Sequence, residues 1–194
     1  PGGNITGQTH VATEQSAKRL QLLKETCPAV TRIAVIFNGD NPSHLLQLKE
    51  MNRVAPILRI GLVSVPVRNA SELDPGLKVA LKTRANAIIT MDDSLVASLR
   101  WRIVDFSKQN KLPVMAEFRM TVEAGGLISY GPNQVELFRL IGGHVDKILR
   151  GANPGDLPVQ QPTKFELIIN LKTARALGLT IPQVVLLRAD EVIQ

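Results

Sequence analysis

The sequence predicts an α/β fold built on a doubly wound parallel sheet, with helices covering both faces of the sheet. Short apolar and β-branched runs, typical of buried parallel strands, alternate along the chain with segments whose apolar residues recur at helical spacing. Asn, Asp, Gly and Pro separate most of these segments, and such residues favour turns and helix starts. The 194 residues, of which 44% are hydrophobic and 21% charged, are enough to form a buried core.

The first half of the chain reads as helices alternating with three strands. Thr13 is a suitable N-cap for a helix through about residue 26. The run RIAVIF at 32–37 has the composition of a buried strand. In the turn after it, Asn41 can cap a helix that begins at Pro42 and continues to about residue 54. The segments that follow are a strand at 62–67, a helix at 71–84 and a strand at 87–91.

The second half continues the alternation. Ser94 is expected to begin a single longer helix, because four apolar residues after it recur at helical spacing and would form a core stripe. Gly178 is placed to end the last clear helix in the left-handed cap conformation. The stripe residues are Leu95, Leu99, Ile103 and Phe106. The other predicted segments are a strand at 112–116, a helix at 119–124, a strand at 127–130, a helix at 133–150, a strand at 164–170 and a helix at 171–177.

Polar residues gather where the predicted strands end. In open parallel sheets, ligands bind beyond the carboxyl ends of the strands, and this rule selects residues 38–41, 92–94 and 117–119. A carboxylate of Asp92 or Asp93 can accept hydrogen bonds from the ammonium of an amino-acid-like ligand, while free N–H groups of the following helix can hold a carboxylate. The alternative is that one of the aspartates, or Ser94, only caps that helix.

Five more residues are candidates for the same site. Glu117 and Phe118 follow the strand at 112–116 and offer an acid and an apolar wall, although each can instead pair or pack locally. Tyr130 ends a strand, and its hydroxyl can reach a cleft or lie at the boundary with solvent. The amides of Asn38 and Asn41 can contact a ligand, but turn formation and capping also explain both residues.

Composition and motifs argue against several classes of protein. The net charge of +6 and the isoelectric point near 9.8 suit a nucleic-acid partner, but the basic residues are scattered and few aromatic residues are available for base stacking. Cys27 is the only cysteine and the three histidines lie far apart, so no metal or other cofactor is predicted. No predicted strand leads into a Gly-rich phosphate loop, and Ser94 lacks the G-x-S-x-G setting of a nucleophile. We therefore expect a binding protein rather than an enzyme.

Two segments resemble a known family. Residues 125–182 read GGLISYGPNQVELFRLIGGHVDKILRGANPGDLPVQQPTKFELIINLKTARALGLTIP, and residues 1–7 read PGGNITG. Their order resembles that of ABC-importer solute-binding proteins, in particular the tryptophan-type proteins with the type I periplasmic-binding-protein fold. The resemblance implies a C-terminal fragment that lacks the first part of the N-terminal lobe. It also implies a crossover at 1–7, a second lobe at 8–124, a returning piece of the first lobe at 125–156, and a final crossover with a strand and helix at 157–194.

The resemblance also implies a function. Such a protein captures a small solute, for example an aromatic or branched-chain amino acid, between two lobes and delivers it to a membrane permease, in the periplasm or as a lipoprotein outside the cytoplasm. Phe118 would form an apolar wall of the cleft, and Tyr130 would lie on the return to the first lobe. The rival interpretation is the cytoplasmic ligand-sensing domain of a lac-repressor-like regulator. An isolated fragment would expose an apolar stripe on the helix at 133–150, so a homodimer is expected.

Overall fold

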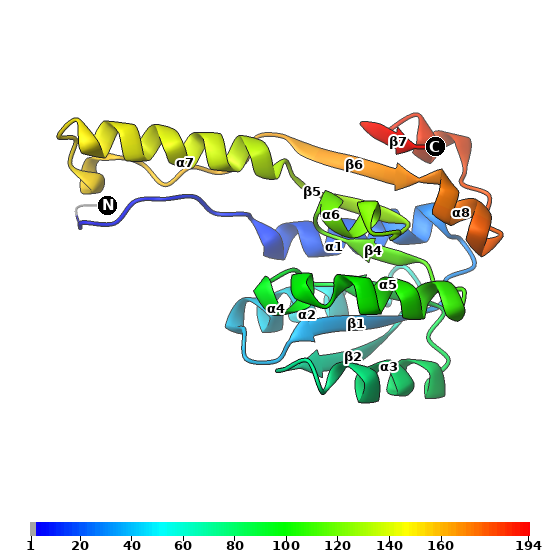
Figure 1. Cartoon of the computed structure of the whole chain (residues 1–194). Helices are drawn as coiled ribbons and strands as arrows, with labels where there is room; N and C mark the ends of the chain where they lie inside the picture. Colours follow the sequence, from blue (N-terminus) through cyan, green and yellow to red (C-terminus); the bar gives the residue numbers. More distant parts are fainter. Residues whose placement is uncertain (1–2) are drawn as a thin grey trace.

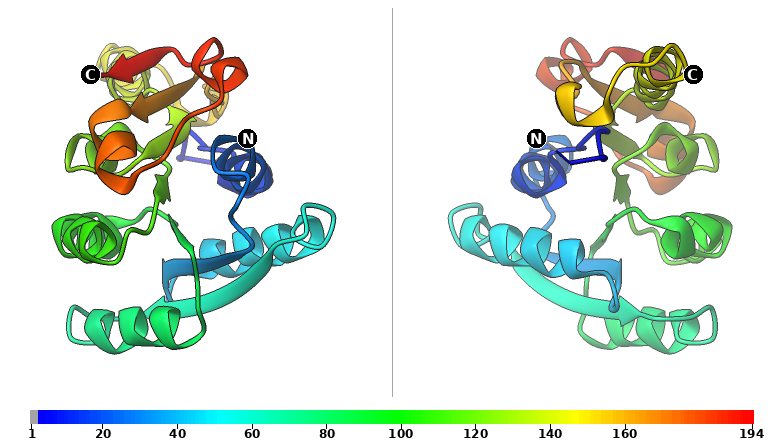
Figure 2. Two further views of the ribbon diagram at one scale, coloured as in Figure 1. Left: turned by 90° about the vertical axis from the view of Figure 1, so that its right-hand side faces the viewer. Right: turned by 90° about the vertical axis from the view of Figure 1, so that its left-hand side faces the viewer.

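A computed structural model describes residues 3–194 and shows one seven-stranded sheet with helices on both faces (Figures 1 and 2). The strands are β1 (Arg32–Asn38), β2 (Gly61–Val67), β3 (Ala87–Thr90), β4 (Val114–Ala116), β5 (Ile128–Pro132), β6 (Phe165–Asn170) and β7 (Glu191–Ile193). They lie in the order β2-β1-β3-β4-β5-β6-β7, and all neighbours are parallel except β5 and β6. The predicted α/β fold with a mostly parallel, doubly wound sheet is confirmed.

The helices begin close to the residues that the capping patterns predict. They are α1 (Ala12–Thr26), α2 (Pro42–Val54), α3 (Leu73–Lys82), α4 (Ser94–Ser98), α5 (Arg100–Gln109), α6 (Arg119–Glu123), α7 (Gln134–Leu149), α8 (Leu171–Leu177) and α9 (Gln183–Leu186), with a short 3-10 helix at Pro154–Asp156. Within the described part of the chain, none of them is long and apolar enough to cross a membrane.

The single long helix expected from Ser94 is wrong, because the helix breaks at Leu99 into α4 and α5. Two side chains bond the carbonyl groups at this point. The Ser98 hydroxyl donates to the carbonyl oxygen of Leu95 at 2.7 Å, and the Arg100 guanidinium donates to that of Ala97 at 2.7 Å. Such side-chain bonds compete with the regular helical ladder, which the periodicity of apolar residues cannot reveal.

Two apolar layers hold the helices on the sheet. Along β1, Ile33, Val35 and Phe37 face one side of the sheet and pack in a core with α1 and α2. Ala34 and Ile36 face the other side and pack with α3, α4 and α5. This alternation follows from the two-residue period of a strand and leaves β1 buried on both faces.

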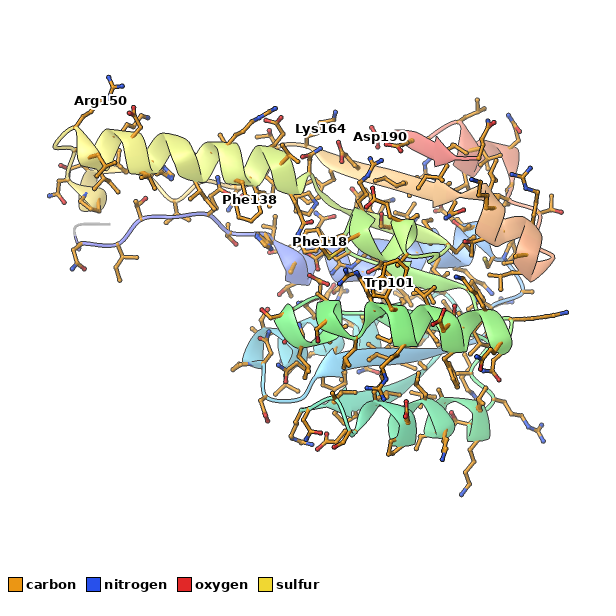
Figure 3. All side chains as sticks on the ribbon, in the orientation of Figure 1. Trp101, Phe118, Phe138, Arg150, Lys164 and Asp190 are labelled. Carbon is orange, nitrogen blue, oxygen red and sulfur yellow. The ribbon has the colours of Figure 1, made fainter. Side chains whose placement is uncertain are left out.

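Helix α7 extends away from the sheet, toward the same side as the described N-terminal segment from residue 3 (Figure 1). Its surface carries large exposed apolar side chains, among them Phe138 at 71% and Leu149 at 82% exposure (Figure 3). Three passages of chain connect this region to the sheet, namely residues 3–9, 130–133 and 157–164, which we call the crossing segments. The first and third pair with each other, since the Thr9 N–H donates to the Gln160 carbonyl and the Gln160 N–H to the Gly7 carbonyl, both at 3.0 Å.

The sheet is continuous across the lobe boundary expected at Gly125. Strand β5 joins β4 through the pairs Met115–Ile128 and Ala116–Ser129. Beyond Ser129, β5 pairs with β6 alone, as far as Pro132 opposite Phe165. The division into two lobes therefore stays a prediction. The pairing of β5 with β4 ends at Ser129, and from there to Pro132 the chain is held in the sheet by β6 alone.

Candidate functional site

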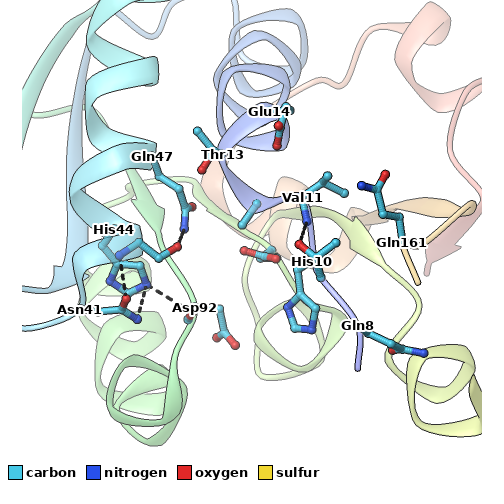
Figure 4. Close-up of a pocket in the computed structure, with 14 residues that line it drawn as sticks. Gln8, His10, Val11, Thr13, Glu14, Asn41, His44, Gln47, Asp92 and Gln161 are labelled. Carbon is cyan, nitrogen blue, oxygen red and sulfur yellow. Dashed lines mark hydrogen bonds between the residues drawn. The ribbon is translucent and has the colours of Figure 1, made fainter. Parts of the chain in front are cut away.

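A cavity of about 630 Å³ opens at the carboxyl edge of the parallel strands, beside the start of α1 (Figure 4). Its walls come from residues 8–14, the first half of α2, and the loops that follow β3 and β4. Strands β1, β3 and β4 all end at this edge, so the cavity lies where the topology of an open α/β sheet favours ligand binding.

Three acids line this cavity, namely Asp92, Glu117 and the exposed Glu14 at the start of α1. Asp92 is partly buried, and Glu117 is only 4% exposed. Burial raises the pKa of Asp92 to about 7, and the negative charges of Glu117 and Asp93 add to the effect, while the cations Arg19 and Arg100 oppose it. Near neutral pH and without a ligand, part of the Asp92 carboxyl groups are therefore protonated. A ligand ammonium can take the place of this proton.

His44 holds the loops at this edge together. It is 1% exposed, and the backbone N–H of Asn38 donates to its Nδ1 at 3.1 Å. Its Nε2 lies 3.3 Å from the carbonyl oxygen of Asp92, so the ring bridges the loops that follow β1 and β3 (Figure 4). The Asn41 side chain accepts from the Ser43 N–H at 3.0 Å and caps α2. Asn38 and Asn41 thus have clear structural roles, and Asn41 also lines the cavity.

The first turn of α1 presents unpaired N–H groups to the cavity. Val11, which precedes the helix, has a left-handed backbone with φ 46° and provides no side-chain cap. Among the bonds of the described residues, none uses the N–H of Thr13 or Glu14, and both residues line the cavity. Such a helix start attracts a carboxylate. The sequence pointed instead to α4, whose start is occupied by Asp93, since its carboxylate accepts from the Val96 N–H at 3.0 Å.

The remaining candidates lie around this cavity rather than in it. Phe118 is 5% exposed, packs edge-on against His10 with ring centroids 5.9 Å apart, and lines a smaller cavity of about 290 Å³ that also includes Glu117. Tyr130 stacks on Phe165 at 5.9 Å. Among the described residues that line either cavity, Asp93, Ser94 and Tyr130 do not occur. The structure therefore brings together Asn41, Asp92 and Glu117.

Other polar residues lie at the site that the sequence did not predict as candidates. Gln8 and His10 precede α1, and both line the cavity. The amide nitrogen and oxygen of Gln8 are buried with no hydrogen-bond partner in the part of the chain that the structure describes. Gln47 and Arg19 lie inside helices, at 2% and 1% exposure. A rule that looks only at strand ends passes over all four residues. Residues 3–194 contain no group of His, Cys, Asp or Glu suited to a metal ion.

The family model for ABC transporter substrate binding proteins matches residues 1–193. The chain belongs to this family. A tyrosine-binding protein from Clostridioides difficile (strain R20291) is 26% identical over 179 residues, which cover 92% of this chain and 51% of the relative. The chain spans about half the length of the curated relatives it matches.

Solved structures of the family are similar over the whole chain. An ABC domain from Streptococcus pneumonia in complex with L-Trp is 29% identical, with a TM-score of 0.87 over 100% of this chain and 66% of that chain. A ligand-free, open substrate binding protein from Clostridium difficile is 26% identical, with a TM-score of 0.70 over 100% of this chain and 64% of that chain. Repressors at 12% and 11% identity share the fold alone. The family model and these neighbours therefore show that the chain has the type I periplasmic-binding-protein fold.

Proposed function

We propose that the chain is part of the solute-binding component of an ABC importer and that its large cavity holds the head group of an amino acid. Asp92 and Glu117 accept hydrogen bonds from the ligand ammonium, and the N–H groups of Thr13 and Glu14 donate to its carboxylate. The observation that carries the proposal is that an uncapped helix start lines one cavity with two carboxylates that are withdrawn from solvent, the buried Glu117 and the partly buried Asp92. The two ends of an amino acid carry complementary charges.

The ligand class follows from the lining and from the relatives. Within the described part of the chain, the rings that line the cavity are those of His10 and His44, and the largest aliphatic side chain is Val11. This surface suits a polar head group, so an aromatic side chain would extend beyond it. The tyrosine-binding relative and the tryptophan complex favour an aromatic amino acid. Delivery to a permease and a location outside the cytoplasm belong to the same proposal and rest on the family.

Closure on the ligand is the expected mode of action. The chain superposes more closely on the tryptophan complex than on the open, ligand-free relative. Such a difference is expected if α7 and the sheet change their angle about the crossing segments. A ligand that contacts both sides shifts the equilibrium toward the closed arrangement. The shift in free energy equals the difference between its binding free energies for the closed and the open arrangement.

An NMR titration with L-tryptophan and L-tyrosine tests the proposal. We expect weak binding by this chain, because it spans about half of its curated relatives and supplies only part of the contacts. The amide signals of Thr13, Glu14, Asp92 and Glu117 should shift most. Tryptamine lacks the carboxylate and N-acetyl-tryptophan lacks the ammonium, so each should bind roughly tenfold to a hundredfold more weakly, the scale of a charged hydrogen bond. Equal binding of all three compounds would contradict the head-group assignment.

A further inference from the structure

Arg19 is a buried cation directly behind the solute cavity. It lies on α1, and its side chain is almost completely buried, at 2% exposure. A guanidinium leaves water only at a large cost in free energy, and burial accordingly lowers the pKa of Arg19. A buried cation in the third turn of α1 calls for a reason beyond packing.

Four groups surround the guanidinium. Its Nη2 lies 3.4 Å from Oε2 of Glu117, and donates to Oε1 of Gln47 at 3.2 Å and to the carbonyl oxygen of Ala12 at 3.3 Å. Its Nη1 donates to the carbonyl oxygen of Tyr130 at 3.5 Å. The first three partners line the cavity, whereas Tyr130 begins a crossing segment. One side chain thus joins α1, α2, the loop after β4 and the chain that leaves the sheet.

We propose that Arg19 is a positioning residue of the solute site. Its guanidinium holds the side chains of Glu117 and Gln47 in place, connects them to the crossing segment at Tyr130, and sets the net charge of the cavity. The inference rests on the proposed function, because it takes this cavity as the solute site. Arg19 balances the charge of Glu117, and the third acid of the lining, Glu14, is exposed to solvent. Asp92 is therefore left to pair with a ligand group of one positive charge.

The groups that face Asp92 decide how it titrates. Glu117 and Asp93 favour its protonated form, while Arg19 and Arg100 favour its charged form. The ring of His44 contacts its backbone carbonyl, and His10 lines the same cavity. Loss of Arg19 removes one of the two cations, so Asp92 should titrate at a higher pH, and ammonium binding should require that higher pH.

The experiment compares Arg19→Met and Arg19→Lys with Arg139→Met, which removes an exposed arginine paired with Glu136 on α7. Carboxyl NMR follows the titration of Asp92 without ligand, and an NMR titration measures L-tryptophan binding from pH 6 to pH 9. In Arg19→Met we expect Asp92 to titrate above its parent value of about 7. A rise of one pKa unit would lower its ionised fraction at pH 7 about fivefold, so the affinity should fall by about that factor at pH 7 and be partly recovered at pH 9. Arg19→Lys should keep the Asp92 titration near the parent value but weaken binding at every pH, since lysine lacks the forked donors. Arg139→Met should behave as the parent.

Two results with folded Arg19→Met would overturn the proposal. One is a titration of Asp92 at the same pH as in the parent. The other is a loss of affinity in this variant that is the same at every pH, as a purely structural role predicts. If Arg19→Met fails to fold, the comparison is made between Glu117→Gln and the double variant with Arg19→Met, in which no buried carboxylate is left without its cation. In the double variant, Asp92 should then titrate at a higher pH than in Glu117→Gln. Titration of Asp92 at the same pH in both variants refutes the proposal. If the parent binds no amino acid, the proposed function fails, while the ligand-free titration still decides the role of Arg19.

Discussion

Asp92 should make the ligand-free protein less stable at and above neutral pH, so its replacement by asparagine should stabilise the fold. Burial, supported by the charges of Glu117 and Asp93, raises its pKa from 3.8 to about 7. Between these values the folded protein retains a proton that the unfolded chain releases, so the free energy of unfolding falls as the pH rises and stays low above pH 7. At 1.36 kcal/mol per pKa unit, this difference corresponds to about 4 kcal/mol. Contact of the partly exposed carboxylate with solvent reduces the expected gain in Asp92→Asn to about 1–3 kcal/mol.

Urea unfolding at pH 5 and pH 8 measures this effect. Asp92→Asn should exceed the parent in stability mainly at pH 8, and it should lose the part of the pH dependence that Asp92 causes. Asp105→Asn is the matched control, because Asp105 is exposed on α5 and does not line the cavity. If Asp92→Asn is no more stable than the parent at pH 8, the charged Asp92 carboxylate does not destabilise the folded protein. There is then no physical reason for Asp92 to bind a ligand cation in preference to remaining free.

Two further predictions concern glycines and the surface of α7. Gly131→Ala should destabilise the fold by roughly 1–3 kcal/mol, because the new Cβ would overlap the carbonyl oxygen of Glu117, whereas Gly142→Ala in open space on α7 should stabilise it by about 1 kcal/mol. Thermal unfolding compares the two variants, and a neutral Gly131→Ala would show that this backbone contact is not as close as described. The exposed apolar side chains of α7 should also drive formation of a homodimer at about tens of micromolar, which Phe138→Glu should weaken. Light scattering that finds a monomeric parent would contradict this expectation.

The strongly patterned elements could be predicted from the sequence, because local interactions determine them. The run at 33–37 is apolar throughout and lies in β1, buried on both faces. Asn41 with Pro42 fixed the start of α2, as capping chemistry requires. Strand β7 and helix α9 were not distinguished, since three- and four-residue elements carry too little pattern. Their positions depend on neighbours such as β6, which are distant in the sequence.

The candidate site was predicted in part. The strand-end rule selected Asp92 and Glu117, because topology alone brings those loops to one edge. It could not say which aspartate caps α4, since that depends on the direction in which each side chain leaves the backbone. It also could not find Arg19, whose bond to the Tyr130 carbonyl joins residues 111 positions apart. In the sequence, a cation within a helical segment reads as a solvent-facing residue.

The arrangement of the crossing segments has a mechanical consequence. Residues 3–9 are hydrogen-bonded to the segment at 157–164, and the chain leaving β5 runs antiparallel to the chain entering β6. One tether alone would act as a swivel, but several tethers side by side resist torsion and leave bending about one axis as the soft motion. If the protein closes on its ligand as proposed, the movement of α7 relative to the sheet is then restricted to one path. The groups around the cavity would meet the same opposing surface in every cycle, without a search over orientations.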